Sequence, residues 1–200
     1  MISGPSGAGK GTLIARALSE LDGLVLSVSA TTRPPREGEK NGQEYLFLSR
    51  SCFRRWIREG RFLEWAAYDG HLYGTPRRPV EENLQAGRDV ILEIELDGAK
   101  QVLERVPDAA FVFIMPPSMA ELERRLEVRG TERRDAVQRR LSEAHRELEE
   151  MTGNPAWLVG HQHYVIVNDD ADSAAKELVK VINEIREAAR SGCSSSSEVH

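Results

Sequence analysis

Cysteine is scarce in this sequence of 200 residues, and long hydrophobic runs are missing altogether. The two cysteines, Cys52 and Cys193, lie far apart, so we expect neither a disulfide framework nor a cysteine metal site. No apolar run approaches the ~20 residues that a membrane span needs, and no signal-like segment opens the chain. We therefore expect a cytoplasmic globular protein without a membrane anchor.

An excess of positive charge is also missing. The 27 lysines and arginines are outnumbered by 32 aspartates and glutamates, which leaves a formal net charge of -5. This balance argues against a general nucleic-acid binder, although it allows local basic patches for small anions. The length is that of one ordinary domain, or of one domain with small insertions.

A glycine-rich segment, GPSGAGKGT at residues 4–12, dominates the amino-terminal region. Its spacing fits a P-loop, in which backbone N–H groups surround a phosphate and a lysine, here Lys10, reaches the terminal phosphates. A hydroxyl group beyond the lysine normally holds Mg²⁺. Because Gly11 directly follows Lys10, that hydroxyl would have to come from Thr12. The alternative is a glycine-rich turn with no ligand. The predicted phosphate-binding residues are Gly4, Ser6, Gly7, Ala8, Gly9, Lys10, Gly11 and Thr12.

The segment before the loop is unusually short. A P-loop normally follows a buried strand, but only three residues precede Gly4. We expect either a truncated strand or one that begins upstream of Met1, and the sequence leaves both open.

Strand-like and helix-like segments alternate along most of the chain. Apolar residues at helical spacing predict helices at 12–21, 51–59, 76–86, 98–105, 118–129, 133–151 and 172–190. Mostly apolar, β-rich segments predict strands at 24–30, 44–48, 62–68, 71–74, 89–96, 109–115 and 163–168. This alternation is typical of an α/β protein with a central parallel sheet covered by helices on both faces. Residues 31–75 form a small, mostly β insertion, and the serine-rich residues 191–200 are expected to be disordered.

Charged side chains cluster where the predicted strands end, which is where α/β folds bind ligands. Arg33 and Arg36 stand three apart in a proline-rich loop, and Glu93 and Glu95 would share one face of a predicted strand. Paired carboxylates on an otherwise apolar strand need a cation or hydrogen-bond donors. The alternative for the two arginines is a solvated basic loop, and the alternative for the two glutamates is an exposed edge strand. Seven arginines between residues 124 and 140 are open to two interpretations in the same way, a ligand-binding lid or a solvated helical hairpin.

Five segments together resemble guanylate kinases. They are residues 27–45 (SVSATTRPPREGEKNGQEY), 62–66 (FLEWA), 73–75 (YGT), 129–132 (RGTE) and 167–170 (VNDD), and with the P-loop they extend the similarity to about residue 185. The resemblance implies a three-layer P-loop kinase fold. Its core would comprise residues 1–30, 76–117 and 152–190, with a GMP-binding insertion at 31–75 and a helical lid region at 118–151. It also implies transfer of a phosphoryl group from ATP to GMP or dGMP.

The resemblance assigns a role to each candidate residue. The GMP-binding residues would be Ser29, Arg33, Arg36, Tyr45, Glu64, Tyr73, Thr75 and Glu95. The residues around the transferred phosphoryl group would be Lys10, Arg125, Arg129 and Arg140, with Mg²⁺ near Thr12 and with Asn168 near the adenine of ATP. Guanylate kinases more often have aspartate at the positions of Glu93 and Glu95, so the added methylene alters the contacts expected there.

The chemistry of these residue types agrees with that assignment. Arginine binds phosphate oxygens through a planar fork, and a carboxylate such as Glu64 would accept hydrogen bonds from the guanine N1–H and amino groups. The phosphate of GMP is itself a nucleophile, so no general base is needed. Two alternatives stay open: a guanylate-kinase-like interaction module, and a kinase acting on another phosphorylated substrate such as a ribose bisphosphate. The oligomeric state is not predicted.

Overall fold

A computed structural model of the chain describes residues 1–68, 70–128 and 134–194. None of the helices in these ranges is long and apolar enough to cross a lipid bilayer. In chain order the elements are β1 (Ile2–Ser3), α1 (Lys10–Glu20), β2 (Leu24–Leu26), β3 (Ala30–Thr31), β4 (Leu46–Phe47), α2 (Arg50–Arg58), β5 (Phe62–Tyr68), β6 (His71–Pro76), α3 (Arg77–Gln85), β7 (Asp89–Ile91), α4 (Leu96–Arg105), β8 (Phe111–Met115), α5 (Met119–Val128), α6 (Arg134–Thr152), the 3-10 helix η1 (Ala156–Leu158), β9 (His163–Val167) and α7 (Ala171–Ser194).

The central sheet is parallel. Strands β1, β8 and β9 pair in that order, and β2 pairs with β7. A bridge between Ile2 and Glu93 joins the two groups, with hydrogen bonds from the Ile2 amide to the Leu92 carbonyl (2.8 Å) and from the Ile94 amide to the Ile2 carbonyl (3.1 Å). The resulting order is β2, β7, β1, β8, β9. In such a sheet all the carboxyl ends lie on one edge, where ligands bind.

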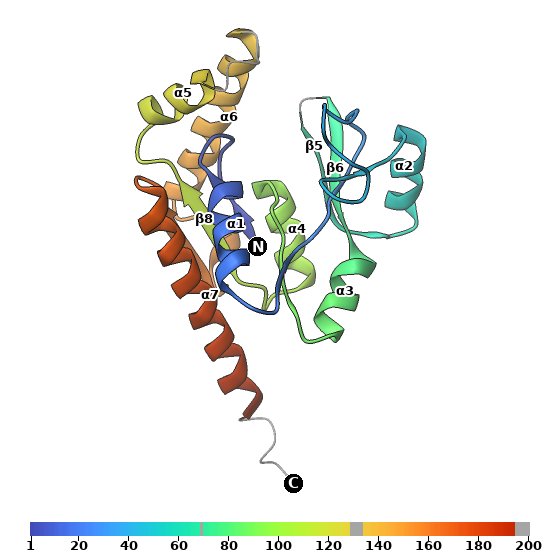
Figure 1. The fold of residues 1–200 in the computed structure, drawn as a ribbon, viewed down its shortest axis with the longest axis vertical. Coiled ribbons are helices and arrows are strands. Elements are labelled where there is room, and N and C mark those ends of the chain that lie inside the picture. Colours follow the sequence, from blue (N-terminus) through green and yellow to red (C-terminus); the bar gives the residue numbers. More distant parts are fainter. Residues whose placement is uncertain (69, 129–133, 195–200) are drawn as a thin grey trace.

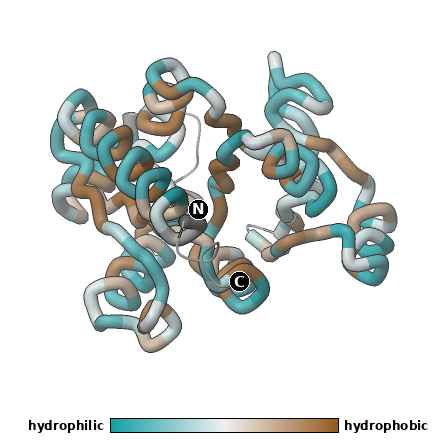
Figure 2. The backbone as a smooth tube through the Cα atoms, turned by 90° about the horizontal axis from the view of Figure 1, so that it is seen from below, coloured by the Kyte–Doolittle hydropathy of each residue, from teal (hydrophilic) through white to brown (hydrophobic). Residues whose placement is uncertain are grey.

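Helices cover both faces of this sheet, which gives three layers (Figure 1). Residues of α1 and α7 pack on one face with Ile114 and Ile166, and residues of α4 pack on the other with Phe111 and Phe113. The strand segments are hydrophobic and the helices are largely hydrophilic (Figure 2), as burial of the strands between helical layers requires. The α/β prediction is confirmed.

A second sheet, in the order β4, β3, β6, β5, lies in a separate lobe with α2 (Figure 1). Strand β6 is antiparallel to both β3 and β5, while β3 and β4 are parallel. The lobe has its own small core, in which the rings of Phe53 and Phe62 stack at 4.4 Å between centroids, beside the buried Ala30 and Leu72. This sheet faces the P-loop across the carboxyl edge of the central sheet.

Three predicted elements differ from the structure. The strand expected at 24–30 is divided into β2 and β3, which belong to different sheets. The strand expected at 89–96 is present but shorter, because β7 ends at Ile91 and α4 begins at Leu96, where residues 96, 99, 102 and 103 are buried at helical spacing. Glu93 therefore lies in a single bridge and Glu95 is the N-cap of α4, so Glu95 does not belong to a strand, although both side chains line the same cavity. Helix α7 continues to Ser194, four residues into the segment expected to be disordered.

Candidate active site

The P-loop connects β1 to α1 through backbone conformations that favour glycine. Gly4, Gly7 and Gly9 all have positive φ, and a Cβ at Gly4 would overlap the Ile114 carbonyl oxygen of β8. Gly9 is the N-cap of α1 and offers no side chain, and the first turn of α1 has no acidic residue. The N–H groups at the start of α1 are therefore available to an anion.

Lys10 lies folded across this loop. Its Nζ donates to the carbonyl oxygen of Gly4 and, at 3.3 Å, to that of Pro5. These two carbonyls are weak partners for an ammonium group compared with phosphate oxygens. The side chain is thus held at the edge of the cavity in a position from which it can turn to a bound phosphate.

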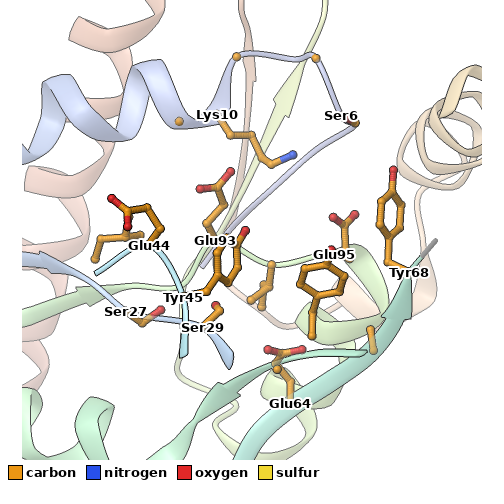
Figure 3. Close-up of a pocket in the computed structure, with 18 of the residues that line it drawn as sticks. Ser6, Lys10, Ser27, Ser29, Glu44, Tyr45, Glu64, Tyr68, Glu93 and Glu95 are labelled. Carbon is orange, nitrogen blue, oxygen red and sulfur yellow. The ribbon is translucent and has the colours of Figure 1, made fainter. Parts of the chain in front are cut away.

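A cavity of about 560 Å³ lies between the P-loop and the second sheet. Figure 3 shows Lys10 on one side and Glu64 on the other, with Tyr45 and Glu95 between them. The predicted site residues that line it are Ser6, Gly7, Gly9, Lys10, Gly11, Thr12, Ser29, Tyr45, Glu64, Tyr73 and Glu95. Its size fits a nucleotide rather than a metal ion or a single phosphate.

Glu64 is the most buried charged group in the cavity wall. Its side chain is on β5, with 4% of the residue exposed, and it accepts a hydrogen bond of 2.7 Å from the hydroxyl of Thr75 on β6. A Cβ at Gly98 would stand 2.6 Å from Glu64 Oε2, so this glycine allows α4 to pack closely against the carboxyl group. Burial raises the pKa of Glu64 to about 7, while the hydrogen bonds from Thr75 act in the opposite direction.

The two arginines of the insertion lie beside the cavity and do not line it. The Arg33 guanidinium donates to both carboxylate oxygens of Glu39, at 2.8 and 3.0 Å, and lies 5.4 Å from the centre of the Tyr45 ring. This fork lowers the pKa of Glu39. Arg36 is exposed, and its backbone amide also donates to Glu39. Glu39 therefore binds the Arg33 guanidinium and the Arg36 backbone, and no hydrogen bond from the Arg36 guanidinium to Glu39 is seen among the described residues.

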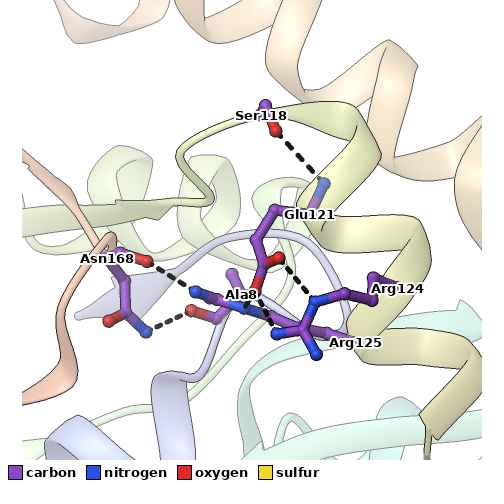
Figure 4. A network of polar contacts seen from close by, with 6 residues as sticks. All are labelled: Ala8, Ser118, Glu121, Arg124, Arg125 and Asn168. Atoms are coloured by element: carbon purple, nitrogen blue, oxygen red, sulfur yellow. Dashed lines mark hydrogen bonds and ion pairs between the residues drawn. The ribbon is translucent and has the colours of Figure 1, made fainter.

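A polar network ties α5 to the P-loop (Figure 4). Arg125 donates to Glu121 at 2.8 Å and to the backbone carbonyl of Asn168 at 3.0 Å. The Asn168 side chain in turn donates to the carbonyl of Ala8 at 2.7 Å. Its Oδ1 is buried and accepts no hydrogen bond within the described ranges. The network leaves a buried acceptor next to the phosphate-binding loop.

Comparison with known proteins places this arrangement in a family. The family model described as guanylate kinase matches residues 1–185. The chain belongs to the guanylate kinase family. It is 53% identical over 185 residues to a guanylate kinase of Rubrobacter xylanophilus, and the aligned residues cover 92% of this chain and 93% of the relative. It is 52% identical over 178 residues to one of Synechococcus sp. (strain CC9902), with 89% of this chain and 91% of the relative covered.

A solved structure agrees with this placement. The crystal structure of guanylate kinase from Anaplasma phagocytophilum has a TM-score of 0.71 and is 32% identical, covering 92% of this chain and 84% of that one. The predicted resemblance to guanylate kinases and the predicted three-layer P-loop kinase fold are both confirmed.

Against this family background, the structure brings together most of the residues that the sequence singled out. Thr75 lies behind Glu64, and Arg125 and Asn168 meet at the P-loop. Arg140 lies on α6, near enough to Tyr68 to influence its pKa. Arg129 lies outside the described residues. The polar cavity residues that the sequence reasoning missed are Ser27, Glu44 and Tyr68, and Leu26, Ala66, Gly74 and Ile94 also line the cavity. Ser27 and Glu44 lie within the 27–45 segment that resembles guanylate kinases, whereas no quoted motif contains Tyr68.

Proposed function

We propose that this guanylate kinase family member transfers the γ-phosphoryl group of ATP to GMP or dGMP and that the cavity residues divide the work between the two nucleotides. The observation that carries the proposal is the position of the buried Glu64–Thr75 pair across one cavity from the P-loop and Lys10. One wall suits a polyphosphate, and the other suits a base with hydrogen-bond donors.

The ATP side is formed by the P-loop. Residues 4–12 would bind the phosphates through backbone N–H groups, and Lys10 would exchange its carbonyl partners for the β- and γ-phosphates. The Asn168 Oδ1, which accepts no hydrogen bond from the residues that the structure describes, suits the amino group of adenine, a donor that guanine lacks at that position.

The donor set near Thr12 fits Mg²⁺. Thr12 is exposed to the cavity beside Lys10, and its hydroxyl is a hard oxygen ligand of the kind that Mg²⁺ prefers. When bound, Mg²⁺ would neutralise charge on the β- and γ-phosphates. The other ligands would be phosphate oxygens and water.

The GMP side is formed by the insertion. Ionised Glu64 would accept hydrogen bonds from guanine N1–H and the exocyclic amine, with Ser29, Thr75 and Glu95 around the base. Adenine would place an acceptor against the buried carboxylate, and such a mismatch can cost several powers of ten in rate. Tyr45 and Tyr73 would bind the GMP phosphate together with Arg33 and Arg36, once Arg33 exchanges Glu39 for phosphate oxygens.

Phosphoryl transfer then requires positioning and positive charge rather than a general base. The GMP phosphate carries close to two negative charges near neutral pH and attacks in line. Arg125, Arg129 and Arg140 would approach the transferred group as the helical lid region closes, and closure would exclude water that could hydrolyse ATP. Division of the chain into a core, an insertion at 31–75 and a lid region at 118–151 is part of this proposal.

A coupled assay of ADP formation tests the proposal with GMP, dGMP, AMP, UMP and a ribose bisphosphate as acceptors. We expect ADP formation with GMP and dGMP only. An interaction module would form no ADP with any acceptor, and activity with the ribose bisphosphate alone would identify the other kinase class. A cytoplasmic location and the lack of nucleic-acid binding stay predictions from the sequence.

A further inference from the structure

The pairing of β5 with β6 is irregular beside Glu64. Phe62 pairs with Pro76 and Glu64 pairs with Thr75, so β5 carries one extra residue, Leu63, between the two pairs. A β-bulge of this kind leaves the extra residue outside the hydrogen-bond ladder and redirects the neighbouring side chains. The carboxyl group that faces the cavity therefore lies next to a break in its own ladder, on a strand at the edge of the sheet.

Side chains of α4, the helix between the central sheet and the second lobe, bind the outer edge of β5 (Figure 1). Gln101 exchanges two hydrogen bonds with the backbone of Trp65, since its Nε2 donates to the Trp65 carbonyl at 2.8 Å and its Oε1 accepts from the Trp65 amide at 3.2 Å. One helical turn later, the Arg105 guanidinium donates to the carbonyl of Leu63. These side chains supply hydrogen bonds where a further strand would otherwise pair.

The hydrogen bonds from α4 hold the backbone on both sides of Glu64. The Leu63 carbonyl belongs to the peptide group that precedes the Cα of Glu64, and the Trp65 amide belongs to the peptide group that follows it. Peptide groups are planar, so the two dihedral angles at Glu64 are fixed once both planes are held. The direction in which the carboxyl group leaves the strand is fixed with them.

Packing between β5 and α4 supports these hydrogen bonds. The Leu63 side chain is buried in the hydrophobic cluster that Ala99 and Val102 of α4 share with the central sheet. Gly98 of the same helix lets α4 approach so closely that a Cβ there would stand 2.6 Å from Glu64 Oε2. Glu64 is therefore attached to the core of the central sheet through α4 as well as to its own sheet through β6.

We propose that Gln101 is a positioning residue for Glu64, holding the β5 backbone so that the carboxyl group meets both hydrogen-bond donors of guanine. The inference rests on the proposed function, in which Glu64 accepts from N1–H and from the exocyclic amine. Gln101 lies outside the cavity wall that the described residues form, so it acts on the nucleotide through Glu64. Loss of the Gln101–Trp65 hydrogen bonds should weaken recognition of the base and leave the P-loop contacts with ATP intact.

Two variants of Gln101 separate hydrogen bonding from packing. Gln101→Leu keeps most of the bulk and removes both hydrogen bonds, whereas Gln101→Glu keeps the shape and the acceptor but places a carboxylate oxygen against the Trp65 carbonyl. Gln85→Leu is the matched control, because Gln85 is an exposed glutamine on α3. Urea unfolding measures the free energy of unfolding of each variant, so that a loss of stability is recorded separately from a loss of recognition.

The comparison of GMP with IMP is the decisive measurement, because IMP keeps the N1–H donor and lacks the exocyclic amine. Isothermal titration calorimetry gives the Kd for GMP, IMP and ATP, and a coupled assay of ADP formation gives the KM values. Gln101→Leu and Gln101→Glu should weaken GMP binding about fivefold, reduce the preference for GMP over IMP about threefold and change the Kd for ATP less than about twofold. Gln85→Leu should match the wild type. If the Gln101 variants lose stability but keep the wild-type preference for GMP over IMP, the proposal is overturned.

Hydrogen exchange of the Trp65 amide, followed by NMR, provides a readout without nucleotide. The amide should be protected in the wild type and in Gln85→Leu, and should exchange about tenfold faster in Gln101→Leu, which lacks the acceptor. An unchanged exchange rate in Gln101→Leu would overturn the positioning role even if the protein phosphorylates GMP. A wild type that protects the Trp65 amide but neither binds GMP nor forms ADP with it would contradict the proposed function instead, so the two failures are distinguishable.

Discussion

The two walls of the cavity use different parts of the chain to meet a ligand. The P-loop wall presents backbone N–H groups, held in place by glycines with positive φ and by packing of the loop on β8. The opposite wall presents side chains, above all the buried Glu64 and its partner Thr75. Backbone N–H groups recognise the charge of a phosphate, which every nucleotide carries, whereas a buried carboxylate recognises the donors of one base. The P-loop wall therefore suits any nucleotide, and the wall around Glu64 would select the base.

The largest effect should follow from removing the cation of the P-loop wall. Lys10→Ala should lower kcat by about 10³, because the charge acts on the transferred phosphoryl group in the transition state. The KM for GMP should change by less than about twofold. Steady-state kinetics with both substrates measure this, and Lys176→Ala, an exposed lysine on α7, is the control. A large rise in the KM for GMP would break the proposed separation of the walls.

A substitution on the opposite wall should have a smaller effect, and this effect should be confined to GMP. Glu64→Gln should lower kcat/KM for GMP by about 10², because an amide cannot accept both guanine hydrogen bonds through one face without turning a donor towards the base. The KM for ATP should be unaffected, which serves as an internal control. Equal losses in both KM values would show that the two walls are not independent.

The pH dependence of this wall has a defined sign. Burial raises the pKa of Glu64 from 4.5 to about 7, so between these values the folded protein binds a proton that the unfolded chain has released. The free energy of unfolding should therefore fall as the pH rises through this window, and less so in Glu64→Gln. Urea unfolding at several pH values measures it. In the same window, kcat/KM for GMP should rise with pH as the acceptor carboxylate forms.

The smallest effects are expected from substitutions of two glycines of the P-loop wall, which test the backbone conformation there. Gly9 has a φ of 94°, and an added Cβ would overlap Asn168 Nδ2, so Gly9→Ala should lower the free energy of unfolding by about 2 kcal/mol. Gly11 lies in α1 with open space around it, and Gly11→Ala should be neutral or stabilise by up to about 1 kcal/mol. Chemical denaturation compares them, and equal effects would contradict the role given to the Gly9 conformation.

The sequence predicted the P-loop wall better than the opposite wall for a physical reason. A phosphate cradle is local, since residues 4–12 contain both the glycines and Lys10. The wall around Glu64 is assembled from distant segments, with Thr75 on the next strand, Gly98 on α4 and Ser27 after β2. The resemblance to guanylate kinases supplied Glu64 and Thr75, but no local pattern predicted Gly98 or Tyr68.

The error in the end of the strand predicted at 89–96 has the same origin. The mostly apolar, β-rich segment 89–96 is typical of a strand, but β1 has only two residues and offers this segment a single bridge. The chain turns into α4 instead, because Leu96, Ala99 and Val102 can bury one helical face. Glu95 thereby becomes the N-cap of a helix and still lines the cavity.

The sequence alone determined the alternation of strands and helices, the P-loop motif and the family, since these depend on local periodicity, glycine positions and short motifs. The tertiary structure decided which side chains share the cavity, how Glu39 holds Arg33, and how burial raises the pKa of Glu64. Burial and charge proximity are properties of contacts between distant segments, so no local pattern of residues can specify them.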